Sequence, residues 1–182
     1  MHILIIGHTS GIGFDIFRSL SKYNDVSGVS KSTGFDISTN ISKTYDYSEF
    51  DVIILNAVGL KFGSQIDTFF NIVESETFNK DSLVIVMSSA SAFKESSNTV
   101  DKVKYSTEKN ALNKASRNLN NLGYNTSVIC PSYVDTEWNK DKDVLKLDVS
   151  DVTKSVYTVL DSFENGVLIG QIVVKKIKKG NI

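Results

Sequence analysis

The chain has 182 residues, of which 41% are hydrophobic and 23% are charged, and its formal net charge at pH 7 is -1. This length fits one domain with a buried core, and the composition excludes wholesale disorder. A charge so close to zero gives no electrostatic basis for a nucleic acid or an anionic membrane as the main partner. No run of residues reaches the roughly 20 apolar positions that a membrane-spanning helix needs.

The cysteine and histidine content excludes several kinds of site. A single cysteine, Cys130, can form neither an intrachain disulfide nor a thiolate metal cluster, which suits a reducing cytoplasm. His2 and His8 have no acidic or cysteine companions at ligand spacing, so no metal site is predicted. The first residues, MHILIIG, lack a basic leader and a small-residue cleavage site, and a secretion signal is not predicted. We therefore expect a cytoplasmic protein.

Short apolar runs alternate with segments of helical period along the chain. The strongest runs are rich in β-branched residues and lack polar alternation, which is typical of strands buried on both faces of a parallel sheet. This alternation predicts an α/β fold, a Rossmann-like doubly wound parallel sheet in a single domain spanning residues 1–182. The predicted strands are residues 2–7, 26–30, 51–59, 82–90, 125–132 and 167–177, and the predicted helices are approximately 11–23, 64–79, 103–122 and 149–163.

A glycine-rich turn directly follows the first predicted strand. The sequence GHTSGIG places Gly7, Gly11 and Gly13 before the apolar-periodic segment FDIFRSL. Glycine permits positive φ and close backbone approach, and a helix N-terminus offers unpaired N–H groups to a pyrophosphate. The turn is therefore a candidate dinucleotide site, although glycines at such a turn can also serve a tight connection alone.

Further motifs follow in the order that one enzyme family uses. GHTSGIG resembles the TGxxxGIG loop of the short-chain dehydrogenases/reductases, with Ile6 at the place of the usual threonine. Four later segments resemble the family's NNAG, strand-end serine, YxxxK and PGxVxT motifs: NAVG at 56–59, MSSAS at 87–91, YSTEK at 105–109 and CPSYVDTEW at 130–138. The resemblance implies a nicotinamide-dependent oxidoreductase that transfers a hydride between NADP(H) and a small carbonyl or alcohol substrate.

The resemblance implies that Ser89, Tyr105 and Lys109 are catalytic. Tyr105 and Lys109 are four residues apart, so on a helix they share one face. A free tyrosine, with a pKa of about 10, is a poor base, and we expect the Lys109 ammonium to lower the pKa of Tyr105. Ser89 would polarise the substrate oxygen, with Ser88 and Ser91 as competing candidates because the register of this segment is open.

Two further residues leave alternatives open. Asn71 resembles the family's helix asparagine, which holds a water in a proton relay behind the lysine, but a helix-surface asparagine is an equal alternative. Glu108 stands where the family has a small or hydroxylated residue. If it points inward it would compete for Lys109, whereas nothing follows if it points to solvent.

The end of the second strand predicts the choice of cofactor. Ser30 and Lys31 can donate to a 2′-phosphate, whereas an acidic residue there would bond an NAD ribose, so we expect NADP rather than NAD. Asp36 and Ile37 resemble the pair that flanks the adenine. The cofactor-binding residues implied by the resemblance are Gly7, Ser10, Gly11, Ile12, Gly13, Ser30, Lys31, Asp36, Ile37, Asn56, Ala57, Gly59, Tyr105, Lys109, Pro131, Ser132, Val134 and Thr136.

The predicted substrate loop, around residues 134–148, is short for this family. It implies either an open site for a bulky substrate or an incomplete one, so a non-catalytic nucleotide-binding protein with a redox-sensing or scaffold role is the alternative. The extended epimerases and dehydratases need a longer C-terminal domain than this chain offers. Relatives commonly form homodimers or homotetramers, but here the oligomeric state stays open.

Overall fold

The computed structural model describes residues 1–59, 61–94 and 98–178, and it contains one six-stranded sheet. All neighbouring strands are parallel, in the order β2-β1-β3-β4-β5-β6. This confirms the predicted Rossmann-like α/β fold. The strands are β1 (His2–Ile6), β2 (Asp25–Val29), β3 (Val52–Leu55), β4 (Leu83–Met87), β5 (Asn125–Pro131) and β6 (Gln171–Val174).

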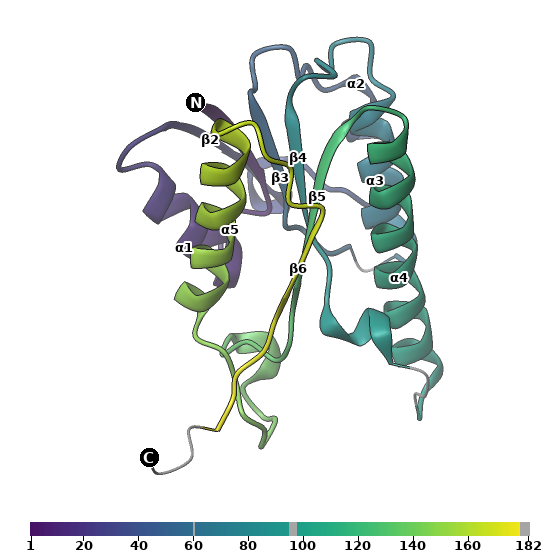
Figure 1. Ribbon diagram of the computed structural model, residues 1–182. Helices are drawn as coiled ribbons and strands as arrows, with labels where there is room; N and C mark the ends of the chain where they lie inside the picture. Colours follow the sequence, from purple (N-terminus) through teal and green to yellow (C-terminus); the bar gives the residue numbers. More distant parts are fainter. Residues whose placement is uncertain (60, 95–97, 179–182) are drawn as a thin grey trace.

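Helices cover both faces of this sheet, which Figure 1 shows edge-on with α1 and α5 on one side and α3 and α4 on the other. The two layers follow from the strand order, because the chain reverses its direction of winding between β1 and β3. The α-helices are α1 (Gly11–Leu20), α2 (Ile41–Thr44), α3 (Ser64–Val73), α4 (Val100–Asn121) and α5 (Val149–Glu164).

Each face of the sheet has its own hydrophobic core. Alternate residues of the central strands point to opposite faces, so Ile5 packs in the α1/α5 layer and Ile6 in the layer of α3 and α4. Every residue of β3 and β4 is buried, as their unbroken apolar sequences predict. These buried central strands therefore fix the positions at which the loops after them begin.

Between β2 and β3 the chain forms little regular structure. A 3-10 turn at Lys31–Thr33 follows β2, and the single-turn helix α2 follows after a loop. The short distance along the chain from the end of β2 to Asp36 leaves no room for a longer helix at this place. In the part of the chain that the structure describes, no helix has the length and apolar character to cross a membrane.

Candidate active site

The carboxyl ends of the parallel strands meet at the lower edge of the sheet in Figure 1. Ligands of open α/β sheets bind at this edge, beside the point where the strand order reverses. The glycine turn after β1, the segments after β3 and β4, and the loop after β5 all lie there. The structure thus brings the sequence motifs to one edge.

The glycine turn lies against the segment that follows β3. Gly7 has φ of +95°, a value that favours glycine, and a Cβ atom there would lie 2.7 Å from the backbone nitrogen of Ala57. The Asn56 side chain donates a hydrogen bond to the Gly7 carbonyl at 2.8 Å. Asn56 and Ala57 therefore pack tightly against the turn at the N-terminus of α1, where Ser10 is the N-cap and Ile12 packs on the core.

Gly13 lets α1 approach β1, because a Cβ atom there would lie 2.0 Å from the Gly7 carbonyl oxygen and 2.5 Å from Asn56 Nδ2. We expect Gly13→Ala to destabilise the fold by about 1–3 kcal/mol, as overpacking does, and to abolish cofactor binding. Thermal unfolding and calorimetric titration with NADPH would measure the two effects. Gly170→Ala is the matched control, since its Cβ atom would meet nothing closer than 3.6 Å. A Gly13→Ala variant that binds NADPH like the wild type would contradict this role.

A small pocket gathers the residues predicted to hold the adenosine half of a cofactor. Its lining includes Lys31, Asp36, Ile37, Ala57 and Gly59. Gly59 packs closely on α3, since a Cβ atom there would lie 2.5 Å from the Ser64 side chain. Residues from the segments after β2 and β3 therefore line one small recess beside the glycine turn.

Ser30 and Lys31 differ in their availability at this pocket. Ser30 is buried, and its Oγ lies 2.9 Å from Ser32 Oγ inside the 3-10 turn. The exposed Lys31 ammonium pairs with Asp36 at 3.0 Å. Hydrogen bonding from the Ser38 backbone and then from Lys31 lowers the pKa of Asp36. Lys31 is thus positioned over the pocket, and Asp36 is held ionised beside it.

Tyr105 and Ser89 lie together at the end of β4. Ser89 begins the 3-10 turn Ala90–Phe93, and its Oγ accepts a hydrogen bond from Ser91 Oγ at 2.9 Å. Burial is the largest influence on Tyr105 and raises its pKa, while a hydrogen bond with the Ser89 side chain opposes this rise. Ser88 instead donates to the Lys109 carbonyl at 3.1 Å, and of the three serines Ser89 is the one that acts on the pKa of the phenol.

Lys109 is fully buried behind Tyr105, and its Nζ lies 5.3 Å from the centre of the tyrosine ring. The ammonium donates to the Met87 carbonyl at 3.1 Å and to Gln65 Oε1. Burial lowers the pKa of Lys109 to about 8, while Glu108 and Cys130 act in the opposite direction. A buried cation held this close to a phenol is the kind of arrangement found at functional sites.

The expected lowering of the Tyr105 pKa is not what the structure shows. Its pKa is raised, by burial first and also by Glu108, and Lys109 is not among the influences on it. Burial lowers the pKa of Lys109 to about 8, so this side chain is neutral at the pH where Tyr105 titrates and cannot favour the phenolate there. In this state Tyr105 is a neutral phenol that can donate a proton.

Glu108 points inward without taking Lys109 as its hydrogen-bonding partner. Its Oε1 accepts hydrogen bonds from the backbone nitrogens of Gln65 at 2.9 Å and Ile66 at 3.4 Å. These are unpaired N–H groups in the first turn of α3, where a carboxylate is favoured. Glu108 therefore points inward, as one of the two alternatives had it, but it caps α3 instead of binding Lys109.

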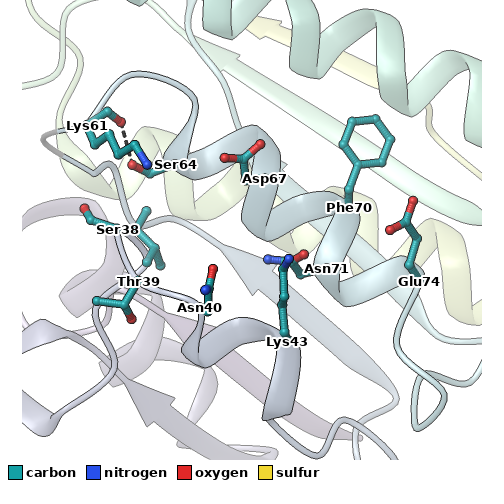
Figure 2. Close-up of a pocket in the computed structure, with 11 residues that line it drawn as sticks. Ser38, Thr39, Asn40, Lys43, Lys61, Ser64, Asp67, Phe70, Asn71 and Glu74 are labelled. Carbon is teal, nitrogen blue, oxygen red and sulfur yellow. Dashed lines mark hydrogen bonds between the residues drawn. The ribbon is translucent and has the colours of Figure 1, made fainter.

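The side-chain hydrogen bond of Asn71 does not lead to Tyr105 or Lys109. Its amide donates to Ser42 Oγ of α2 at 2.9 Å. Figure 2 shows it between α3 and α2 in a polar groove that Lys43, Asp67 and Glu74 also line. The role expected of Asn71 in a relay behind the lysine is therefore not supported.

Gln65 is the site residue that the sequence motifs missed. It is completely buried at the start of α3, and it meets Lys109 although the two residues are 44 positions apart. No family motif contains it. The only signal in the sequence is an amide at the start of a helix that directly follows the NAVG segment, which is too common to identify a site.

The loop after β5 lies next to the glycine turn. The buried Pro131 ends β5, and the Ser132 nitrogen still donates to the Val174 carbonyl of β6 at 2.8 Å. Val134 forms an isolated bridge with Leu147, which closes the base of the predicted substrate loop. The methyl group of Thr136 lies 3.4 Å from where a Gly11 Cβ would be. Thr136 therefore faces the candidate phosphate site from the opposite side.

The described residues contain no group of three or more His, Cys, Asp and Glu side chains that could hold a metal ion. The structure does, however, contain residues suited to the pyrophosphate and to the nicotinamide half of a dinucleotide. The glycine turn packs closely on Ala57 and Asn56 and leads into the N-terminus of α1, and Lys109 offers an N–H group beside Tyr105. These residues fit a nicotinamide cofactor.

No protein-family model and no curated protein matches this sequence. Solved structures do match: a small-chain dehydrogenase in complex with NADPH has a TM-score of 0.72 and 20% identity, with 96% of each chain covered. The 3-alpha-hydroxysteroid dehydrogenase from Pseudomonas sp. B-0831, complexed with NADH, has a TM-score of 0.74 and 14% identity over 96% of this chain and 94% of that chain. A short-chain dehydrogenase/reductase of Brucella melitensis, a glucose/ribitol dehydrogenase, has a TM-score of 0.69 and 14% identity over 94% and 93%. The chain therefore has the fold of the short-chain dehydrogenase/reductase family.

Proposed function

We propose that the protein is a short-chain dehydrogenase/reductase that transfers a hydride between NADP(H) and a small carbonyl or alcohol substrate. The observation that carries this proposal is the meeting of Ser89, Tyr105 and Lys109 at the carboxyl edge of the sheet. The similar fold of a dehydrogenase with NADPH and of another with NADH supports a nicotinamide cofactor.

The chemistry that the nicotinamide ring supplies when bound is the donation or acceptance of a hydride at the substrate carbon. Ser89 holds the substrate oxygen by hydrogen bonding, and Tyr105 gives that oxygen a proton during reduction. The raised pKa of Tyr105 keeps the proton on the phenol at neutral pH. Lys109 places a positive charge behind the ring, which stabilises the phenolate that forms as the proton leaves.

The preference for NADP rests on Lys31, which lies at the adenosine pocket with its ammonium exposed. A phosphate that enters this pocket would compete with Asp36 for the ammonium. Since the ammonium can form a charge-assisted hydrogen bond with this phosphate, which NAD(H) lacks, Lys31 would favour NADP(H).

Replacing this lysine tests the preference. We expect Lys31→Glu to weaken NADPH binding by roughly tenfold to a hundredfold, the value of one hydrogen bond to a charged group, and to change NADH binding little. Calorimetric titration of each protein with NADPH and with NADH measures both affinities. Lys80→Glu, an equal charge reversal in the turn before β4, is the matched control. Equal weakening of both cofactors by Lys31→Glu would overturn the NADP assignment.

A non-catalytic nucleotide-binding protein is the second candidate, and the short loop around residues 134–148 is the observation that favours it. A pure binder has no need of a phenol beside a polarising serine. NADPH binding without any hydride transfer would support this candidate against the first.

A further inference from the structure

The Gln65 side chain forms hydrogen bonds with three other residues of this site. Its Nε2 donates to the Met87 carbonyl at 3.0 Å and to the Leu55 carbonyl at 3.4 Å, and its Oε1 accepts from the Lys109 ammonium. The amide thus bridges the carboxyl ends of β3 and β4 and at the same time binds the buried lysine. None of these atoms is available to solvent, because Gln65 is completely buried.

The orientation of this amide is determined by its neighbours. A flipped amide would put Oε1 against the two carbonyl oxygens of Leu55 and Met87 and an NH₂ group against the Lys109 ammonium. Both contacts would be repulsive, so only the observed orientation satisfies every group. Lys109 therefore always meets a carbonyl oxygen at Gln65.

Helix α4 holds Gln65 at two points with consecutive residues. The Glu108 carboxylate accepts from the Gln65 backbone nitrogen at 2.9 Å, while Lys109 binds the Gln65 side chain. The start of α3 is thereby fixed to α4 beside the catalytic group. Movement of Gln65 would displace the Lys109 ammonium relative to the Tyr105 ring.

We propose that Gln65 is the positioning residue for Lys109, and that it performs the supporting role expected of Asn71. The proposal rests on the proposed function, in which Lys109 stabilises the Tyr105 phenolate. Gln65 Oε1 and the Met87 carbonyl take two of the three N–H groups of the ammonium, which leaves one for a hydroxyl of the cofactor. Both acceptors favour the charged form of the lysine against the cost of its burial.

Other groups also act on Lys109 and are common to every variant compared below. Tyr105 and Glu108 face it from its own helix, and Cys130 faces it from β5. Glu108 raises the pKa of Lys109. A change confined to Gln65 therefore isolates the contribution of the amide.

The test is a pH titration of Lys109 by NMR in the full chain with isotope-labelled lysine, with the Lys109 signal identified by its loss in Lys109→Arg. We expect Gln65→Glu to raise the Lys109 midpoint by about one to three pH units, since it adds an opposite charge. Gln65→Met, which removes the acceptor, should lower the midpoint. Gln171→Met, the same change at an exposed residue of β6, is the control and should leave it unchanged.

Activity and cofactor binding separate this inference from the proposed function. If the proposal is correct, Gln65→Met lowers kcat more than it raises KM, and the pH dependence of kcat moves in the direction of the NMR midpoint. Lys109 midpoints that are unchanged in folded Gln65→Glu and Gln65→Met would overturn the positioning role. If the midpoints move but the wild type does not bind NADPH, the positioning of Lys109 is supported and the proposed function fails.

Discussion

The Tyr105→Phe variant should lose carbonyl reduction almost completely, with kcat falling by about 10²- to 10⁴-fold, because the site loses its proton donor. Phenylalanine keeps the ring that lies 5.3 Å from Lys109, so the shape of the site is retained. We therefore expect NADPH affinity to stay close to that of the wild type. Steady-state kinetics and calorimetric titration measure the two quantities.

The matched control for this variant is Tyr157→Phe. It removes the same hydroxyl from α5, where Tyr157 donates to the Ser19 carbonyl at 2.9 Å on the α1/α5 face. Its activity should equal that of the wild type. If Tyr105→Phe keeps more than about a tenth of the wild-type kcat, Tyr105 is not the proton donor.

Lys109→Met should combine a loss of activity with a gain in stability. We expect kcat to fall by about 10²- to 10³-fold, the usual effect of removing one preorganised donor from a site. Replacing a buried charge by an apolar side chain often stabilises a protein, and about 1 kcal/mol here would raise the unfolding midpoint at pH 7 by roughly 2 to 4 °C. Differential scanning calorimetry measures this shift.

The dependence of this stability gain on pH has a definite sign. Burial lowers the pKa of Lys109 from 10.5 to about 8, so the unfolded chain binds more protons between these two pH values. The free energy of unfolding of the wild type therefore rises relative to that of Lys109→Met as the pH increases through this window. The stability advantage of Lys109→Met should be fully present at pH 7 and should shrink as the pH rises through this window.

Lys114→Met, on an exposed position of the same helix, controls for the loss of a positive charge. Neither its stability nor its activity should change appreciably. A Lys109→Met variant that is less stable than the wild type at pH 7 would show that the hydrogen bonds to Gln65 and Met87 outweigh the cost of burying the ammonium.

Local patterns in the sequence were sufficient to predict the sheet and most of its helices. The apolar runs of β1, β3, β4 and β5 have no polar alternation, because both faces of each strand are covered. The ends of elements were less predictable. Helix α3 stops at Val73 instead of near residue 79. Beyond its end, Thr77 Oγ1 accepts from the Tyr47 nitrogen at 2.9 Å, a contact between residues 30 positions apart.

Two other element ends also depend on interactions that the periodicity does not contain. Helix α4 begins at Val100, before the predicted start near 103, because the Thr99 side chain caps it by accepting from the Lys102 nitrogen at 3.3 Å. Strand β6 covers only Gln171–Val174 of the predicted 167–177, and its residues alternate between exposed and half-buried. Because none of the residues of β6 is fully buried, its sequence lacks the continuous apolar run of the central strands.

The candidate site was predictable where a motif carries it and not where long-range packing does. Ser89, Tyr105 and Lys109 lie in short motifs with fixed spacing, and the structure brings them together. Gln65 and Glu108 gain their roles from the contact between α3 and α4, which no local pattern reveals. Asn71 was assigned by analogy with a helix asparagine, but the face of α3 that carries it meets α2.

The most direct test of the central claim is hydride transfer itself, measured with NADPH that is deuterated at the transferable position of the nicotinamide ring. The wild type is incubated with this cofactor and a panel of aldehydes and ketones, and the alcohol products are analysed by mass spectrometry. We predict deuterium on the carbinol carbon of at least one product with the wild type, and at least about a hundredfold less in the same time with Tyr105→Phe. NADPH binding by calorimetry without deuterium transfer to any member of the panel would contradict the enzymatic function and favour a nucleotide-binding scaffold.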